Sequence, residues 1–178
     1  MERKYFIFGD LILDMLVYEK KYILFASLHP YLKDLKDREL ERERRKKCIY
    51  IDGAILNYCT VPILTVEPSH QIACNRHKVV TQEVGRFQVN VDVEMGFGLI
   101  WEAYIYDTNS KWLLKNALLV IEVMLKKMYN VNTVYINAYD PQFQYEYESI
   151  LKDAGYEYAW GRGHNKVYKK SLSSLHVI

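Results

Sequence analysis

The residues best suited to binding a metal ion lie close together near the middle of the chain. His70, Cys74 and His77 are separated by four and then three positions. On a helix they would share one face, and with a fourth ligand such as Cys59 they could bind zinc. This spacing does not match standard zinc motifs, and loosely packed loop residues would show the same pattern. We therefore predict no metal.

Other catalytic patterns are missing from the sequence. His29, His164 and His176 are isolated, and each fits a surface or capping position better than a catalytic one. We find no Ser-His-Asp order, no phosphate-binding Walker loop and no paired-carboxylate motif. A catalytic site, if present, has to be inferred from the elements that would position its residues.

Residues 33–47 form a dense run of mixed charge, with eight basic and five acidic side chains. Two interpretations remain open. The run is either a solvated helix end or arm, or a surface that binds an acidic partner. The interleaved glutamates disfavour a phosphate-binding track. The cations of the second interpretation are Arg42, Arg44, Arg45, Lys46 and Lys47.

Composition predicts one globular domain that is not specialised for nucleic acid or membrane. The 178 residues are 50% hydrophobic and 26% charged, with a net charge of +2. No apolar run approaches the roughly 20 residues of a membrane span, and residues 1–17 make a poor signal peptide. An odd number of cysteines, three, fits a reducing compartment. The 16 tyrosines suit core and contact surfaces alike.

The clearest periodicity lies in the C-terminal half. Residues 99–106 predict a strand, residues 111–129 a long helix with Ser110 as its N-cap, and residues 133–139 a second strand. This order implies a parallel pair with a right-handed crossover. The helix is expected to bury Leu114, Ala117, Leu118, Ile121, Met124, Leu125 and Met128, and to turn Lys111, Lys115, Glu122 and Lys126 toward water.

A second helix and a hairpin follow. Asp140-Pro141 is a cap followed by proline at the first helical position, and Gly155 lies where a C-terminal glycine cap belongs. Residues 156–160 and 166–172 predict two strands of a hairpin. The apolar tail, residues 171–178, could dock on a neighbour.

The first third of the chain is harder to interpret. Residues 5–8 predict a strand. Residues 11–17 fit either a short helix that begins at Asp10 or a strand, and the pattern leaves both open. Pro30 then begins a predicted helix.

The middle of the chain predicts strands separated by an irregular region. Residues 49–66 resemble a strand with a tight turn at Asp52-Gly53, and Pro62 would sit at an edge or bulge. Residues 67–82 are polar and predict irregular structure with one short helix. Residues 87–94 alternate strictly between apolar and polar side chains, which predicts a strand followed by a hairpin turn.

From Arg86 onward, this order of elements resembles the GNAT superfamily, the acyl-CoA-dependent N-acetyltransferases. In that family a parallel strand splays away after the long helix, and a second helix ends in a tyrosine-x-x-x-glycine-aromatic pattern. The run Leu151-Lys152-Asp153-Ala154-Gly155-Tyr156 is similar to that ending. The resemblance implies an α/β (α+β) class, with a GNAT-like mixed central sheet flanked by helices. It places a β-α-β-α-β core in residues 86–172 of a single domain, after a divergent half (1–85) and before a short tail (173–178).

The resemblance also implies where a cofactor would bind. In the family, amides of a glycine-rich turn before the long helix point at the cofactor pyrophosphate. Residues 107–112 contain no glycine here, and Asp107 adds a negative charge. Ser110 and Lys111 could hold one anion, so they are the cofactor-binding candidates if the protein is an enzyme.

Catalytic candidates follow only under the same enzyme alternative. The family's general-acid tyrosine aligns with Leu151, and Tyr147 lies one turn earlier. Glu102 is the candidate general base, because apolar neighbours would raise its pKa. The competing interpretation of Glu102 is an ordinary charge on the outer face of a strand.

Two classes of function remain. The first is a degenerate copy of the GNAT fold that is catalytically inactive and acts in structure or protein interaction, similar to GNAT-like virion proteins of tailed phages. The second is an N-acetyltransferase that uses acetyl-CoA with an atypical cofactor loop. For the first class we expect no tight acetyl-CoA binding, no nucleic acid, and association with itself or other proteins. The location would be the cytoplasm or a virion.

Overall fold

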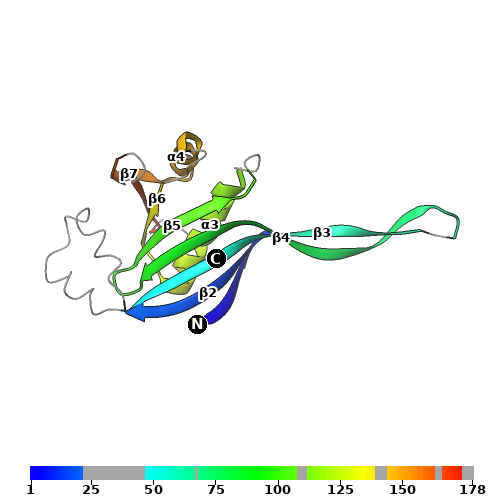
Figure 1. Ribbon diagram of the computed structural model, residues 1–178, viewed down its shortest axis with the longest axis horizontal. Helices are drawn as coiled ribbons and strands as arrows, with labels where there is room; N and C mark the ends of the chain where they lie inside the picture. The colour runs from blue at the N-terminus through cyan, green and yellow to red at the C-terminus, as the bar shows by residue number, and fades with distance from the viewer. Residues whose placement is uncertain (22–46, 67, 108–111, 139–143, 163–165, 174–178) are drawn as a thin grey trace.

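A mixed sheet and two helices make up the described part of the chain in our computed structural model, which covers residues 1–21, 47–66, 68–107, 112–138, 144–162 and 166–173. The eight strands lie in the order β1-β2-β3-β4-β5-β6-β8-β7 (Figure 1). The predicted class, α+β with a mixed central sheet, is confirmed. The elements are β1 Glu2–Phe8, β2 Leu11–Lys21, β3 Lys47–Val66, β4 Ile72–Asp92, β5 Phe97–Ile105, α3 Trp112–Tyr129, β6 Thr133–Asn137, α4 Gln144–Asp153, β7 Glu157–Trp160 and β8 Val167–Ser171.

The predicted parallel pair is present. Strands β1 to β5 form an antiparallel meander, whereas β5 and β6 run parallel and are joined by α3. Strand β8 then pairs antiparallel with β6, and β7 lies at the sheet edge beside β8. The turn after α4 also follows the prediction: Gly155 has φ +93°, and Tyr156 N–H donates to the Leu151 carbonyl at 2.9 Å.

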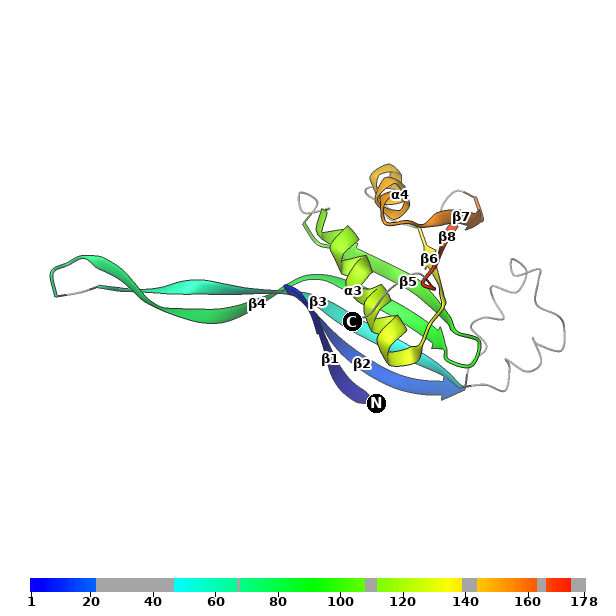
Figure 2. The same ribbon diagram turned by 180° about the vertical axis from the view of Figure 1, so that it is seen from behind.

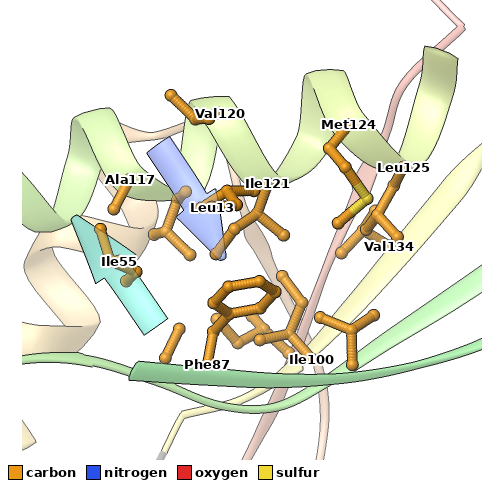
Figure 3. Close-up of a cluster of buried hydrophobic side chains, with 14 of the residues drawn as sticks. Leu13, Ile55, Phe87, Ile100, Ala117, Val120, Ile121, Met124, Leu125 and Val134 are labelled. Atoms are coloured by element: carbon orange, nitrogen blue, oxygen red, sulfur yellow. The ribbon is translucent and has the colours of Figure 1, made fainter. Parts of the chain in front are cut away.

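The core lies between one face of the sheet and α3. Figure 3 shows Leu13, Phe87 and Ile100 of the sheet directed toward Ile121 and its neighbours on the helix. Burial of the predicted helical stripe is confirmed at Leu114, Ala117, Leu118, Ile121, Met124 and Leu125, and Met128 is partly buried. The expectation that Glu122 faces water is wrong. Its side chain is buried, because Lys170 of β8 and Tyr156, which follows α4, contact it on this side of α3.

The structure decides between the two readings of residues 11–17. They belong to strand β2, which buries Leu11, Leu13, Met15 and Val17 and leaves Leu16 more exposed. The prediction of a turn at Asp52-Gly53 is wrong, because both residues lie inside β3. Glycine is needed there for close packing: a Cβ on Gly53 would lie 2.5 Å from a ring atom of Phe87.

The prediction of irregular structure and a short helix at residues 67–82 is also wrong. Residues from Ile72 onward form β4, which pairs with β3 along nearly its whole length. The predicted helix after Pro30, the N-cap Ser110 and the Asp140-Pro141 start lie outside the described residues, as do most of the charged run and of the tail.

Strands β3 and β4 continue well beyond their neighbours as a two-stranded ribbon, which Figure 1 and Figure 2 show projecting from the body. Strand β2 begins opposite Asn57, and β5 ends opposite Gly85. From the pair Tyr58–Thr81 to the pair Val66–Ile72, the two strands pair only with each other in the described structure. We call residues 58–66 and 68–81 the arm.

Candidate functional site

The candidate site lies where β5 and β6 separate. The two strands are paired only from Phe97–Thr133 to Ile100–Ile136, after which β5 continues to Ile105. A β-bulge sits at this point: Val89 lies opposite Ile100 and Gln88 lies opposite Glu102, so Trp101 is the extra residue. Bulges bend a strand and increase its twist. The bulge therefore accounts for the divergence of β5 from β6 and leaves the following edge of β5 without a strand partner from β6.

Tyr147 of α4 reaches this edge. Its hydroxyl donates a hydrogen bond to the Ala103 carbonyl at 2.8 Å, and the side chain is buried. Leu151, one turn later, is also buried, within the apolar core. The structure thus brings Tyr147 next to the strand that carries Glu102. The phenol satisfies a backbone carbonyl of this strand edge.

Glu102 lies on the bulged segment with its side chain exposed to solvent. The apolar surroundings that we expected around this carboxylate are therefore not present. Its charge acts on a neighbour instead: burial raises the pKa of Tyr104, and the Glu102 carboxylate raises that pKa further.

The segment before α3, where the family resemblance implies a cofactor would bind, is described only in part. Ser110 and Lys111 lie outside the described residues. On either side of them Asp107 is exposed, and Trp112 is 66% exposed at the first turn of α3. Below these residues a groove of about 570 Å³ separates the first half of α3 from the base of the arm and the β1–β2 turn. Its lining includes Phe8, Asp10, Tyr58, Trp112 and Leu119.

A buried ionic cluster that the sequence did not predict holds the C-terminal elements together. Lys170 Nζ of β8 lies 2.5 Å from a Glu122 carboxylate oxygen, and the Tyr156 hydroxyl donates to the other at 3.1 Å. Lys170 also donates to the Ala154 carbonyl at the end of α4. Burial raises the pKa of Glu122 despite the ammonium beside it. Every polar atom of the cluster has a partner, so we assign it a structural role.

Aromatic side chains gather on the sheet face away from α3. Tyr18 and Tyr50 stack with centroids 5.4 Å apart, and Tyr50 and Trp101 pack around buried Cys48 and Leu99. A shallow hollow of about 400 Å³ lies beside them and includes Asp52 and Gln88 in its lining. The aromatic residues are scattered along the sequence, which explains why no local motif indicated this surface.

The suggested zinc ligands do not share a helix. His70 lies in the turn at the tip of the arm with φ +61°, and His77 lies on β4 opposite Pro62. In the part of the chain that the structure describes, no three His, Cys, Asp or Glu residues gather as a metal ion would require. Neither of the two helices described combines the length and apolar character needed to cross a bilayer.

Comparisons with known proteins give similarity in fold only. No family model and no curated protein matches the sequence. A Vibrio cholerae protein assigned as a ribosomal-protein-serine acetyltransferase is 9% identical with a TM-score of 0.49, covering 94% of this chain and 97% of that one. The Vibrio cholerae spermidine/spermine N-acetyltransferase is 6% identical with a TM-score of 0.44, covering 89% and 95%. A GNAT-family acetyltransferase from Staphylococcus aureus is 10% identical with a TM-score of 0.40, covering 89% and 100%.

Proposed function

We propose that this protein is a protein-interaction component built on a GNAT-like scaffold and that it does not catalyse acetyl transfer. The observation that carries the proposal is the hydrogen bond from the Tyr147 hydroxyl to the Ala103 carbonyl. An extended thioester carrier with amide groups would need free backbone groups on an unpaired strand edge. Here a buried side chain of the protein itself occupies one of them.

The loop before α3 supports the same proposal. Residues 107–112 have no glycine that would let the backbone approach a pyrophosphate closely. The exposed Asp107 carboxylate would repel such an anion, and Leu151 offers no proton where the family resemblance places a tyrosine. Each of these features weakens cofactor binding or proton donation by itself.

The arm supports the part of the proposal that concerns protein interaction. A ribbon that projects from the body and carries exposed aliphatic side chains is suited to contact with another macromolecule. The setting that we propose is a larger protein assembly, of which the virion of a tailed phage is the example given by the sequence resemblance.

The alternative is an N-acetyltransferase with an unusual cofactor loop. It is favoured by one observation: Glu102 is exposed on the bulged strand beside the splayed edge, where a general base could meet a substrate amine. In this alternative Tyr147 would have to release Ala103 before it could donate a proton to a leaving group.

Calorimetric titration with acetyl-CoA tests the proposal. We expect no binding at cofactor concentrations in the tens of micromolar, for the wild type and for Tyr147→Phe alike, because the loop is unsuited in both. Tyr158→Phe is the matched control, since the Tyr158 hydroxyl donates to the Gly161 carbonyl at an exposed position far from the splayed edge. Micromolar binding by the wild type would overturn the proposal, and acetyl transfer that is lost in Glu102→Gln would establish the alternative.

A further inference from the structure

One face of the arm carries its strongly exposed apolar side chains, with the exposed pair Pro62–His77 between Val79 and Leu64. Residues paired across an antiparallel ribbon point to the same side, and neighbouring pairs alternate. The register puts Tyr58, Val79, Leu64, Val66 and Ile72 on one side, including the change of phase at the bulge between Ile63 and Leu64. These five are the large hydrophobic side chains of the arm that are strongly exposed, from 38% at Tyr58 to 71% at Val66. We call them the arm stripe.

The opposite face of the arm is different in charge and exposure. It carries the pairs Val61–Lys78 and Ile63–Arg76, in which an aliphatic residue lies beside a long cationic one. Val61 and Ile63 are less exposed than the residues of the arm stripe, as expected where the methylene stems of lysine and arginine cover apolar neighbours. The cations of the arm are therefore segregated from its exposed apolar face.

This arrangement needs a partner along the length of the arm. A two-stranded ribbon is at best marginally stable alone in water, and the arm stripe exposes aliphatic side chains on top of that. The end of the arm is polar: Ser69, His70 and Gln71 lie between Val66 and Ile72 and are exposed. The apolar residues lie behind this polar end and on one face only, which favours lateral contact with a protein surface over insertion of the tip into a lipid bilayer.

We propose that the partner is a second copy of this chain, with the two arms packed stripe to stripe and antiparallel about a two-fold axis. This inference rests on the proposed function and names its partner. In such an interface each contact occurs twice: the tip residues Leu64, Val66 and Ile72 of one copy meet Tyr58 and Val79 of the other. Lys78 and Arg76 remain on the two outer faces, in water, so that self-association brings no lysine or arginine side chains together, while His77 of each copy lies near the two-fold axis.

The groove at the base of the arm completes the interface. From Tyr58 to Val66 the arm is about 26 Å long at roughly 3.3 Å per residue, and at about 10 Å wide the two facing stripes cover on the order of 500 Å² in projection. A stable interface buries about 1,200 Å² or more. The groove contains Tyr58 of the arm stripe together with Phe8, Trp112 and Leu119. The tip of the partner's arm would reach it and add the missing area.

The oligomeric mass in solution tests the inference. We expect light scattering to give twice the 21.2 kDa of one chain. Ile72→Lys places a charge in the interface at two symmetric positions. If each position weakens the affinity tenfold, the dimer dissociation constant rises about a hundredfold. Lys78→Ala, on the outer face, is the matched control and should leave the mass unchanged. Circular dichroism and the melting temperature show whether each variant retains its fold.

Disulfide trapping tests the antiparallel geometry separately. In a Cys59→Ser, Cys74→Ser background the remaining cysteine, Cys48, is buried. His77 pairs with Pro62 at the middle of the arm on the stripe face, so His77→Cys should cross-link two chains under mild oxidation. Lys78→Cys faces outward and should not. Equal cross-linking of both, or none at His77→Cys, would overturn the geometry.

A monomeric wild type would overturn the second-copy inference, and flotation of that monomer with phosphatidylserine vesicles would assign the arm to lipid. Neither result would contradict the proposed function, which is tested by acetyl-CoA binding and rests on the occupied edge at Ala103. A monomer that binds acetyl-CoA would overturn both.

Discussion

Two buried polar side chains, Tyr147 and Glu122, join helices to strands that are far away in the sequence. Tyr147 bonds to a carbonyl 44 positions earlier, and Glu122 to an ammonium 48 positions later. No local pattern indicates either contact. Glu122 in particular was expected in water because of its position relative to the apolar stripe of α3, and only the packing of α4 and β8 on that side reverses the expectation.

The ion pair Glu122–Lys170 leads to a prediction about the stability of the protein. Lys170→Met leaves a buried carboxylate without its cation, and we expect a loss of about 3 kcal/mol at neutral pH. The pKa of Glu122 is already raised in the folded state, and the substitution raises it further. A folded protein that binds more protons than the unfolded chain loses stability as the pH rises through that window. The deficit should therefore grow from about pH 4 upward.

Urea unfolding at pH 4.5 and pH 7 measures this effect. Lys169→Met, an exposed neighbour on the same strand, is the control and should be nearly neutral. Adding Glu122→Gln to Lys170→Met should restore part of the loss at pH 7. A deficit of the same size at both pH values would show that the charge of Glu122 is not its cause.

At the scale of elements, helix α3 is the element whose contribution to stability is clearest. Ile121 is fully buried at the centre of its stripe, as Figure 3 shows. Ile121→Ala should cost about 2–5 kcal/mol, because it removes a large side chain from a packed core. Lys115→Ala on the exposed side of the same helix should cost less than about 0.5 kcal/mol. Guanidinium unfolding compares the two, and equal losses would mean that the helix is packed in a different orientation.

The elements that could be predicted from the sequence are those that bury one face. Helix α3 and strand β6 repeat their apolar residues with the period of their secondary structure, because one side meets the core, and strand β5 is rich in aromatic and branched residues. The first strand of the arm was predicted within residues 49–66, whereas its second strand was missed because residues 67–82 are polar and meet solvent. The predicted turn at Gly53 was wrong for another reason. Glycine there makes room for the Phe87 ring, and the sequence cannot distinguish that role from a turn.

The candidate site was predictable only in part. The family resemblance implied that a strand splays away after the long helix, and the structure shows that β5 and β6 separate beside the bulged segment that carries Glu102. The bulge at Trp101 and the contact of Tyr147 with Ala103 depend on strand register and on the approach of α4. Both are set by tertiary packing, which short-range patterns do not encode.

At the scale of the whole molecule, the body and the arm divide the structure into a packed part and an unpacked part. None of the buried hydrophobic side chains in the described ranges belongs to the arm. Replacing residues 58–81 by Asn-Gly should therefore preserve the fold, because Asn57 and Gln82 are already paired and this dipeptide favours a tight hairpin.

We expect the melting temperature of this armless variant to stay within a few degrees of the wild type, with a monomeric mass. Differential scanning calorimetry and light scattering measure both. The control is the full-length double variant Leu64→Thr, Val66→Thr. It keeps the arm but removes two side chains of the arm stripe. Collapse of the armless body would show that the ribbon contributes to folding of the sheet.

The alternation of side chains along the arm also restricts how its length can change between relatives. Adding one residue to each strand would turn every following side chain to the opposite face, so the stripe survives only changes of two residues per strand. Each such step moves the tip by about 6.6 Å. The distance between two bodies joined by their arms would then change only in fixed steps, while the sequence of the body stays unchanged.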